Sequence, residues 1–173
     1  MKSINGSESV FIRKASGDTS RLKKVTIKDF VDPLYRSKET GLKDVSNVET
    51  VGFNFNTRAP ETTPILSVGR YHWDMKMRRI ALPAPYKSIT LTPNHTVFAI
   101  TPDGVFPLRC DRVIKSQTIL VVDDVNEDRL EDAHPGAVAV KEAIFTKRIP
   151  IVYDIITAHE NVILGNRVVV SSS

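Results

Sequence analysis

Two runs of strand-forming residues, 88–91 and 96–100, flank the short motif Thr92-Pro93-Asn94-His95. Proline followed by asparagine suits the two central positions of a four-residue turn, and the outer positions of such a turn lie within about 7 Å of each other. The motif therefore predicts a tight turn that holds the hydroxyl group of Thr92 close to the imidazole of His95. Because strands enter and leave this turn, the pair would be fixed on a rigid β framework.

A second apolar strand stands at the very end of the chain. The run Val168-Val169-Val170 is followed only by Ser171, Ser172 and Ser173. The last residues of a domain are usually poorly ordered unless something ties them down. An apolar strand in this place indicates that the carboxyl terminus is buried in the fold for a purpose.

Strand signals also dominate the rest of the chain, and the sequence predicts an all-β fold. Apolar and polar residues alternate over residues 71–78, which places Tyr71, Trp73, Met75 and Met77 on one face of a half-buried strand. Further strand-like runs are found at residues 10–13, 106–108, 113–114, 119–121, 137–140 and 149–156.

One short helix is predicted after the first strands. Thr26 can cap it, with Asp29 three residues later, and Pro33 would end or restart it after Asp32. The apolar residues that share one face of this helix are Ile27, Phe30, Val31 and Leu34. Residues 36–47 are polar without periodicity and predict a loop, and residues 123–136 predict a mobile acidic loop.

Composition fits one domain with a sizeable core: 173 residues, of which 41% are hydrophobic and 25% charged. No apolar run approaches the roughly 20 residues that span a bilayer, and the start does not resemble a signal peptide. We therefore expect no membrane contact and a cytoplasmic location. The single cysteine, Cys110, excludes internal disulfides and any multi-cysteine metal site.

Charge is unevenly distributed along the chain. Residues 1–121 hold 19 Lys or Arg and 11 Asp or Glu, a balance of +8, whereas residues 122–173 hold 5 and 9, a balance of −4. A basic body with an acidic end fits nucleic-acid binding or two segments that attract each other. Uneven surface charge is the simplest interpretation of the same numbers.

The motifs and their order resemble the intein family, the Hint-fold domains that excise themselves from a host protein. Thr92-x-x-His95 is similar to the first conserved histidine block of that family, and the chain has mini-intein length. Residues 3–10 resemble the opening block with serine in place of cysteine, residues 106–121 the strand pair after the histidine block, and residues 152–155, 159–162 and 165–170 the closing blocks. Within the family, the chain looks most like a serine-class intein of a phage-type B-family DNA polymerase.

This resemblance implies an all-β, horseshoe-shaped Hint fold with short helical turns and with both termini at one site. It implies that residues 1–2 are a remnant of the upstream host segment (the N-extein), that residues 3–172 form the splicing domain, and that residue 173 is the C-extein remnant. The acidic loop 123–136 stands where family members carry an endonuclease domain or a natural split. The expected partners are the flanking extein segments in cis and, if the chain is naturally split, a complementary fragment; no metal or cofactor is expected.

The resemblance also implies roles for individual residues. Ser3 would attack the carbonyl group of Lys2 and convert this amide to an ester, which needs activation because a serine hydroxyl is a weak nucleophile. His95 would donate a proton to the leaving nitrogen, and Thr92 would hold the bond by hydrogen bonding. For the second step, the family uses an acid or histidine near His159 and Glu160, and the sequence leaves open which of the two serves.

Asp154 is expected to have a structural role in its strand. The carboxyl terminus departs from the family pattern, in which a terminal asparagine cyclises to cut the chain. Here Ser171 takes the penultimate position, Ser172 replaces the asparagine and cannot cyclise, and Ser173 is the downstream nucleophile. The chain is thus expected to be a splicing-blocked precursor, although a register error of one residue or a family member that never splices also fits.

Three rival functions are weaker. A Hint domain that only cleaves would need no terminal asparagine. A basic β-barrel that binds nucleic acid fits the isoelectric point near 9.2 and the basic run 70–79. The alternation argues against it, because it places Tyr71 and Trp73 together on the core face, where they could not stack on bases. A conventional hydrolase is less favoured, since the chain lacks the usual nucleophile and metal motifs, and the pair His72 and Asp74 has no third ligand nearby.

Overall fold

The computed structural model describes residues 2–15, 21–127 and 129–172, so the predicted host residues Met1 and Ser173 lie outside the described part of the chain. Strands make up nearly all of its regular structure. In the first half they are β1 (Ile4–Asn5), β2 (Ser9–Lys14), β3 (Lys23–Thr26), β4 (Gly41–Asp44), β5 (Val48–Asn54), β6 (Ala59–His72), β7 (Lys76–Ala81) and β8 (Ile89–Leu91). In the second half they are β9 (Thr96–Thr101), β10 (Gly104–Arg109), β11 (Thr118–Asp123), β12 (His134–Ala139), β13 (Glu142–Arg148), β14 (Ile151–Thr157), β15 (Asn161–Ile163) and β16 (Val169–Ser171).

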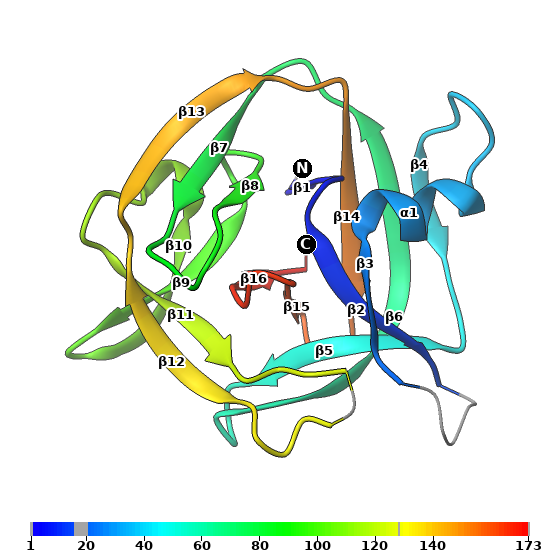
Figure 1. The fold of residues 1–173 in the computed structure, drawn as a ribbon. Coiled ribbons are helices and arrows are strands. Elements are labelled where there is room, and N and C mark those ends of the chain that lie inside the picture. The colour runs from blue at the N-terminus through cyan, green and yellow to red at the C-terminus, as the bar shows by residue number, and fades with distance from the viewer. Residues whose placement is uncertain (1, 16–20, 128, 173) are drawn as a thin grey trace.

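The strands form two curved, antiparallel sheets that enclose a common centre (Figure 1). In the described chain, the larger sheet has the order β13-β7-β8-β1-β14-β6-β5-β2-β3, with β4 paired to β6, and the smaller one has the order β12-β11-β9-β16-β15, with β10 paired to β9. Both short terminal strands are interior members of their sheets. The all-β, horseshoe-shaped fold predicted from the sequence is confirmed.

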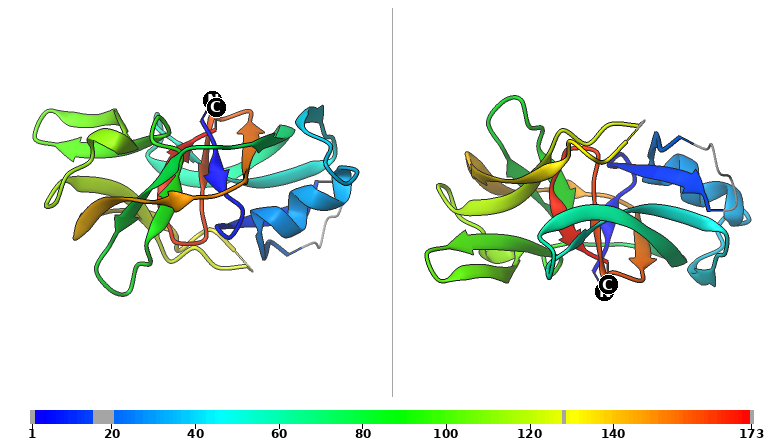
Figure 2. Two further views of the ribbon diagram at one scale, coloured as in Figure 1. Left: turned by 90° about the horizontal axis from the view of Figure 1, so that it is seen from above. Right: turned by 90° about the horizontal axis from the view of Figure 1, so that it is seen from below.

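The strands at the two ends of the chain lie inside the two sheets and lead to the same side of the molecule (Figure 2). Strand β1 lies between β8 and β14, and β16 lies between β9 and β15. The marks for the two ends overlap at the edge of the molecule in both views of Figure 2, and in Figure 1 they lie one above the other. Burial of β1 and β16 explains why apolar residues persist so near both ends.

The largest core cluster joins the two sheets. It draws apolar side chains from both terminal strands, Ile4 from β1 and Val170 from β16, and both are essentially inaccessible to solvent. Burying a side chain of this size stabilises a fold by roughly 1.5–3 kcal/mol. The terminal segments are therefore fastened by hydrophobic burial as well as by pairing in the sheets.

The predicted helix is confirmed as α1 (Ile27–Val31). The hydroxyl group of Thr26 accepts a hydrogen bond of 3.1 Å from the amide of Asp29, the capping arrangement that satisfies a free donor at a helix start. Pro33 lies in the following 3-10 turn η1 (Asp32–Leu34), so the chain changes helix type where the sequence predicted an end or restart.

Three element predictions need correction. Residues 71–78 do not form one strand, because β6 ends at His72 and β7 begins at Lys76, and Met75 in the bend between them is 60% exposed. The predicted loop 36–47 contains the strand β4, which pairs with β6 through its backbone despite its polar sequence. The predicted loop 123–136 is shorter, since its first residue and residues 134–136 pair in β11 and β12.

Candidate functional site

Ser3 is fully buried (0% exposed) immediately before β1. Its amide donates a hydrogen bond of 2.8 Å to Oγ1 of Thr92, and its carbonyl oxygen accepts one of 2.8 Å from the Thr92 amide. The next residue, Ile4, pairs with Leu91 on one side and with Tyr153 on the other. The antiparallel register therefore places Thr92 and Asp154 on the two sides of Ser3.

The Thr92–His95 motif forms the predicted turn, closed by a hydrogen bond of 3.0 Å from the His95 amide to the Thr92 carbonyl oxygen. A second segment braces it from outside. The amides of Cys110 and Asp111 donate to the carbonyl oxygens of His95 and Pro93 at 2.7 and 2.9 Å, and Sγ of Cys110 lies 2.9 Å from the Thr92 carbonyl oxygen. The turn is thus held on both sides, as a rigid frame requires.

His95 presents a neutral imidazole to the site. Its ring is buried, and its Nδ1 accepts a hydrogen bond of 2.9 Å from the Thr96 amide, which leaves the ring proton on Nε2. Burial, with a smaller effect of the positive charge of Lys2, lowers the pKa of His95 to about 4. At neutral pH the ring is therefore an uncharged Nε2–H donor.

Asp154 lies beside Ser3, a placement that the sequence analysis missed by giving this residue only a structural role. Burial raises the pKa of Asp154 to about 6, and interaction with the Ser3 side chain opposes that rise. Oγ of Ser3 and Oδ1 of Asp154 are both shielded from solvent, and neither has a partner at regular hydrogen-bond geometry in the described structure. In the sequence, the only indication that Asp154 belongs to the site was the presence of an acidic residue within the apolar run 149–156.

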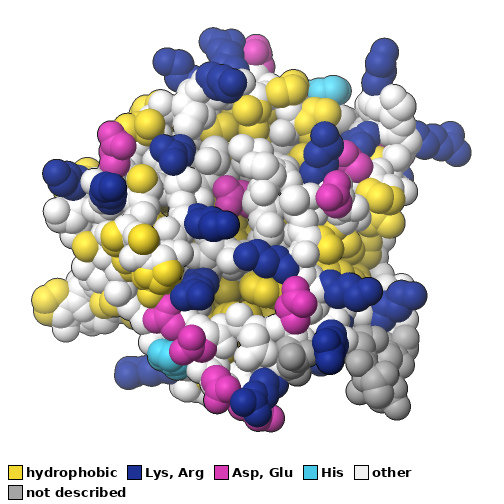
Figure 3. All heavy atoms as spheres, in the orientation of Figure 1, with side chains coloured by type: hydrophobic (Ala, Val, Ile, Leu, Met, Phe, Trp, Pro, Cys, Tyr) yellow, Lys and Arg dark blue, Asp and Glu magenta, His cyan; other side chains and the backbone are white. Residues whose placement is uncertain are grey.

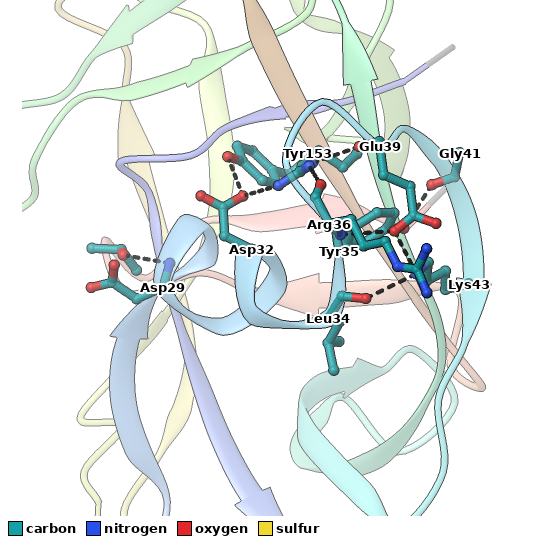
Figure 4. Close-up of polar contacts among 11 residues, drawn as sticks. Asp29, Asp32, Leu34, Tyr35, Arg36, Glu39, Gly41, Lys43 and Tyr153 are labelled. Atoms are coloured by element: carbon teal, nitrogen blue, oxygen red, sulfur yellow. Dashed lines mark hydrogen bonds and ion pairs between the residues drawn. The ribbon is translucent and has the colours of Figure 1, made fainter.

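A polar network anchors β14 next to this carboxyl group (Figure 4). The hydroxyl group of Tyr153 donates a hydrogen bond of 2.8 Å to Oδ1 of Asp32, which also accepts one of 3.1 Å from Nη1 of Arg70. The same guanidinium donates to the carbonyl oxygens of Arg36 and Glu39 at 2.6 and 2.9 Å. The helical segment after β3 is thereby tied to the strand that carries the site.

The carboxyl-terminal residues form the second half of the site. Ser172 is 3% exposed; its amide donates to the Glu160 carbonyl oxygen at 3.0 Å, and its Oγ accepts a hydrogen bond of 3.3 Å from the Thr157 amide. Ser171 pairs with Asn161, and its Oγ is buried without a hydrogen-bond partner in the described structure.

Asn161 is a further site residue that the sequence analysis did not single out. Its buried side chain bridges to β5, with Oδ1 accepting from the Phe53 amide at 2.7 Å and Nδ2 donating to the Phe53 carbonyl oxygen at 2.9 Å. Oγ1 of Thr157 donates to the Asn161 carbonyl oxygen at 2.7 Å. The side-chain amide of Asn161 therefore fixes the turn that contacts Ser172. In the sequence, the only indication of this role was an asparagine next to an apolar strand.

The structure places His159 and Glu160 in the turn between β14 and β15. Nε2 of His159 contacts the carboxylate of Glu61, and its backbone amide donates a hydrogen bond of 3.1 Å to Oγ1 of Thr63. The side chain of Glu160 is exposed on a backbone with φ of 62°. Among the described contacts, neither side chain touches Ser3 or Ser172; Glu160 reaches Ser172 through its backbone.

Strand β14 connects the two halves of the site. Asp154 faces Ser3 and Thr157 contacts Ser172, so about 10 Å of strand separates the two ends at roughly 3.3 Å per residue. Strand β16 pairs with β9 through Val170 and Val97, which lie two residues from Ser172 and from His95 respectively. One small region thus collects Ser3, Thr92, His95, Asp154 and Ser172.

The described residues contain no group of three or more His, Cys, Asp or Glu side chains that could hold a metal ion. No helix among them has the length and apolar character to cross a membrane. On the face drawn in Figure 3, Lys and Arg side chains are scattered among acidic and apolar ones rather than gathered into a continuous basic patch.

No family model and no curated protein matches this sequence. Solved structures match it along its whole length. The transcription factor IIB Mvu mini-intein has a TM-score of 0.80 at 18% identity, with 99% of each chain covered. The KlbA intein precursor from Methanococcus jannaschii has a TM-score of 0.77 at 19% identity, covering 100% of this chain and 92% of its own, and the TvoVMA intein has 0.76 at 17%, with 99% and 98% covered. The chain therefore has the fold of these inteins.

Proposed function

Starting from this intein (Hint) fold, we propose that the chain is a protein-splicing domain that begins by an acyl shift at Ser3. The observation that carries the proposal is the position of Ser3, buried between Thr92 and Asp154, with its amide bonded to the Thr92 hydroxyl group. A serine without a functional role would more often be exposed, where water solvates its hydroxyl group.

In the proposed first step, Oγ of Ser3 attacks the carbonyl carbon of Lys2. The C–N bond between these residues breaks, a C–O ester bond forms, and the nitrogen of Ser3 becomes a free amine. The hydroxyl proton must leave Oγ and the nitrogen must gain a proton, so the step needs both a base and an acid. No metal ion, oxidant or reductant enters this balance.

The site offers both groups. Asp154, with a pKa of about 6, is an acceptor for the Oγ proton at neutral pH. The Nε2–H group of neutral His95 is the donor toward the leaving nitrogen, and Thr92 holds that nitrogen through its hydrogen bond. Donors and acceptors that are already fixed in place do not need to reorient as charge develops during the reaction.

We infer that the later steps are transesterification to Ser173 and, in an active parent, cyclisation of an asparagine at position 172. Ser172 lacks the carboxamide that this cyclisation requires, so the present chain would be a splicing-blocked precursor. Its buried position and its contacts with Thr157 and Glu160 fit the place of a terminal asparagine. We retain His159 and Glu160 as candidates for proton transfer in the second step.

Hydroxylamine tests the first step, because it cleaves esters and leaves ordinary amides intact. We expect the chain, extended upstream by a host segment, to be cut between Lys2 and Ser3, and Ser3→Ala to abolish the cut. The matched control is Ser7→Ala, which removes an exposed serine four residues away and should cleave normally. Equal cleavage in Ser3→Ala would refute the assignment.

A cleavage-only Hint domain is the second candidate, favoured by the absence of a carboxamide at Ser172. The Ser172→Asn variant, expressed between two larger host segments, distinguishes splicing from cleavage alone. Ligation of the two segments supports splicing. Release of the upstream segment without ligation, from a folded protein that retains Ser173, supports the cleavage-only function.

We also propose a serine-class intein of a phage-type B-family DNA polymerase as the origin of this chain, and a cytoplasmic location. If the natural form is split, the complementary piece would join at the acidic connection between β11 and β12.

A further inference from the structure

Glu8 lies in the turn between β1 and β2, five residues after Ser3, and its carboxyl group points into the molecule. Oε2 accepts a hydrogen bond of 3.0 Å from the Thr90 amide, and Oε1 accepts one of 3.3 Å from Nδ2 of Asn166. The two donors come from segments 76 residues apart in sequence, so one side chain joins three parts of the chain.

Each of the three segments leads directly to the site. Thr90 lies on β8, two residues before the Thr92 that holds the Ser3 amide. Asn166 lies in the turn between β15 and β16, and β16 leads to Ser172. The Glu8 carboxyl group is thus a link between the two ends of the site that passes outside β14.

Both ends of this link are fixed by further contacts. The backbone amide of Glu8 donates to the Asn5 carbonyl oxygen at 3.0 Å, and its carbonyl oxygen accepts from the Ile27 amide at 2.8 Å. Oδ1 of Asn166 accepts a hydrogen bond of 3.1 Å from the Val168 amide. A displacement of Glu8 would therefore be passed to both turns rather than absorbed by a loose side chain.

The carboxyl group has no described ion-pair partner. The charged side chains on the neighbouring elements include Lys23 and Lys24 on β3, Lys28 and Asp29 on α1, Lys87 before β8 and Arg167 after Asn166. Burial raises the pKa of Glu8 to about 7, and the hydrogen bond from Thr90 opposes this rise. The group therefore changes charge in a range where the reaction can be followed.

Resting on the proposed acyl shift at Ser3, we propose that Glu8 is a positioning residue, whose carboxyl group couples the strand holding Thr92 to the turn holding Ser172 and so aligns the two ends of the site. The ionised form accepts from both donors at once. A proton on Oε1 would turn this acceptor into a donor that faces the N–H group of Asn166. In Glu8→Gln, the NH2 group has the same effect when the side-chain oxygen accepts from Thr90.

The first test compares hydroxylamine cleavage at Lys2–Ser3 in the full chain and in Glu8→Gln and Glu8→Ala. We expect at least a tenfold loss of rate in Glu8→Ala at pH 8. The ratio of the native rate to the Glu8→Gln rate should rise with pH through about 7, because only the native group gains its second acceptor on ionisation. Glu142→Gln, on the exposed edge strand β13, should match the native protein.

A double-mutant cycle shows whether Glu8 acts through Asn166. If it does, Glu8→Ala should add little to the loss already caused by Asn166→Ala. Fully additive losses, a native rate in Glu8→Ala, or a ratio to Glu8→Gln that is flat between pH 6 and 8 would each overturn the proposal.

A second readout needs no reaction. Since the pKa of Glu8 is raised from 4.5 to about 7, its contribution to stability is present at low pH and is lost as pH rises toward 7. Between pH 5 and 8.5, the folding equilibrium constant of the native chain should fall by a factor on the order of 10² relative to Glu8→Gln. If no protein cleaves, the proposed function fails, while non-additive losses of unfolding free energy in the Glu8→Ala and Asn166→Ala double-mutant cycle still support the link; cleavage without either pH effect overturns the link alone.

Discussion

At the scale of single residues, the pKa values of Asp154, beside Ser3, and of His95, in the turn that begins at Thr92, shift in opposite directions for one reason. Burial penalises charge, so it raises the pKa of Asp154 to about 6 and lowers that of His95 to about 4. At pH 7 the site therefore holds a carboxylate and a neutral imidazole, the acceptor and the donor that the proposed N-to-O acyl shift would use.

Asp154→Asn tests the base. Because the carboxyl group accepts a proton only when ionised, the rate of hydroxylamine cleavage at Lys2–Ser3 should rise with pH through about 6 in the native chain. The variant should cleave at least tenfold more slowly at pH 7 and lack this rise, a size typical of general-base loss. A native rate with a native pH profile would exclude Asp154 from the chemistry.

The protonation state of His95 can be read directly. Its depressed pKa means that the ring nitrogens should keep the shifts of the neutral Nε2–H form from pH 8 to about 5 and titrate near 4. Stability contributed by the neutral ring is present above pH 6.5 and is lost as pH falls toward 4. Imidazole ¹⁵N NMR measures the midpoint, with the urea-unfolded chain as control; a folded midpoint near 6.5 would contradict the burial argument.

At the scale of elements, the sequence predicted correctly those features that depend on a few neighbouring residues, namely a helix cap, a helix break and a turn. The cap at Thr26, the break at Pro33 and the Thr92–His95 turn are all found in the structure. Alternation failed over 71–78, because the same pattern continues through a bend whose Met75 is exposed. Strand β4 was missed, because a polar strand is formed there by pairing with β6 rather than by its own side chains.

The site was predicted in part for a similar reason. Ser3, Thr92 and His95 belong to motifs that can be recognised along the chain, and the structure brings these three together. Asp154 and Asn161 have meaning only after distant strands pair, since their partners are 151 and 108 residues away. Residue patterns alone do not reveal which buried polar group meets which neighbour.

Asn161 provides an energetic test of the element that receives the carboxyl terminus. Asn161→Ala leaves the amide and carbonyl groups of Phe53 buried without these partners, which costs roughly 1–3 kcal/mol for each such group. Urea unfolding should show a loss of about 2–6 kcal/mol. Asn56→Ala, at an exposed turn position, should lose under about 0.5 kcal/mol, and equal losses in the two variants would refute the bridging role.

At the scale of the whole molecule, the fold interleaves its two halves. Strand β14 lies between β1 and β6, and β16 lies between β9 and β15, so residues after the acidic connection complete both sheets. The connection itself is docked, because the carbonyl oxygen and Oε1 of Glu127 accept from the amides of Leu22 and Lys24 at 3.1 and 3.2 Å.

Division of the chain after Asn126 should therefore give two pieces that associate without a covalent link. We expect the complex to form more slowly as salt is raised from 0.05 to 0.5 M, because the pieces carry opposite net charge and salt screens their attraction. Size-exclusion chromatography and stopped-flow fluorescence of the single tryptophan, Trp73, measure this. Failure to associate at low salt would mean that the two halves depend on their connection to fold.

The central claim is that the bond between Lys2 and Ser3 can pass from amide to ester within the folded chain. ¹³C at the Lys2 carbonyl and ¹⁵N at Ser3 make this bond visible by NMR, through the one-bond coupling that exists only in the amide. We expect a second carbonyl signal without that coupling, present in the native chain and in Ser7→Ala and absent in Ser3→Ala. A single, fully coupled amide signal in the folded native chain from pH 6 to 9, together with resistance to hydroxylamine, would contradict it.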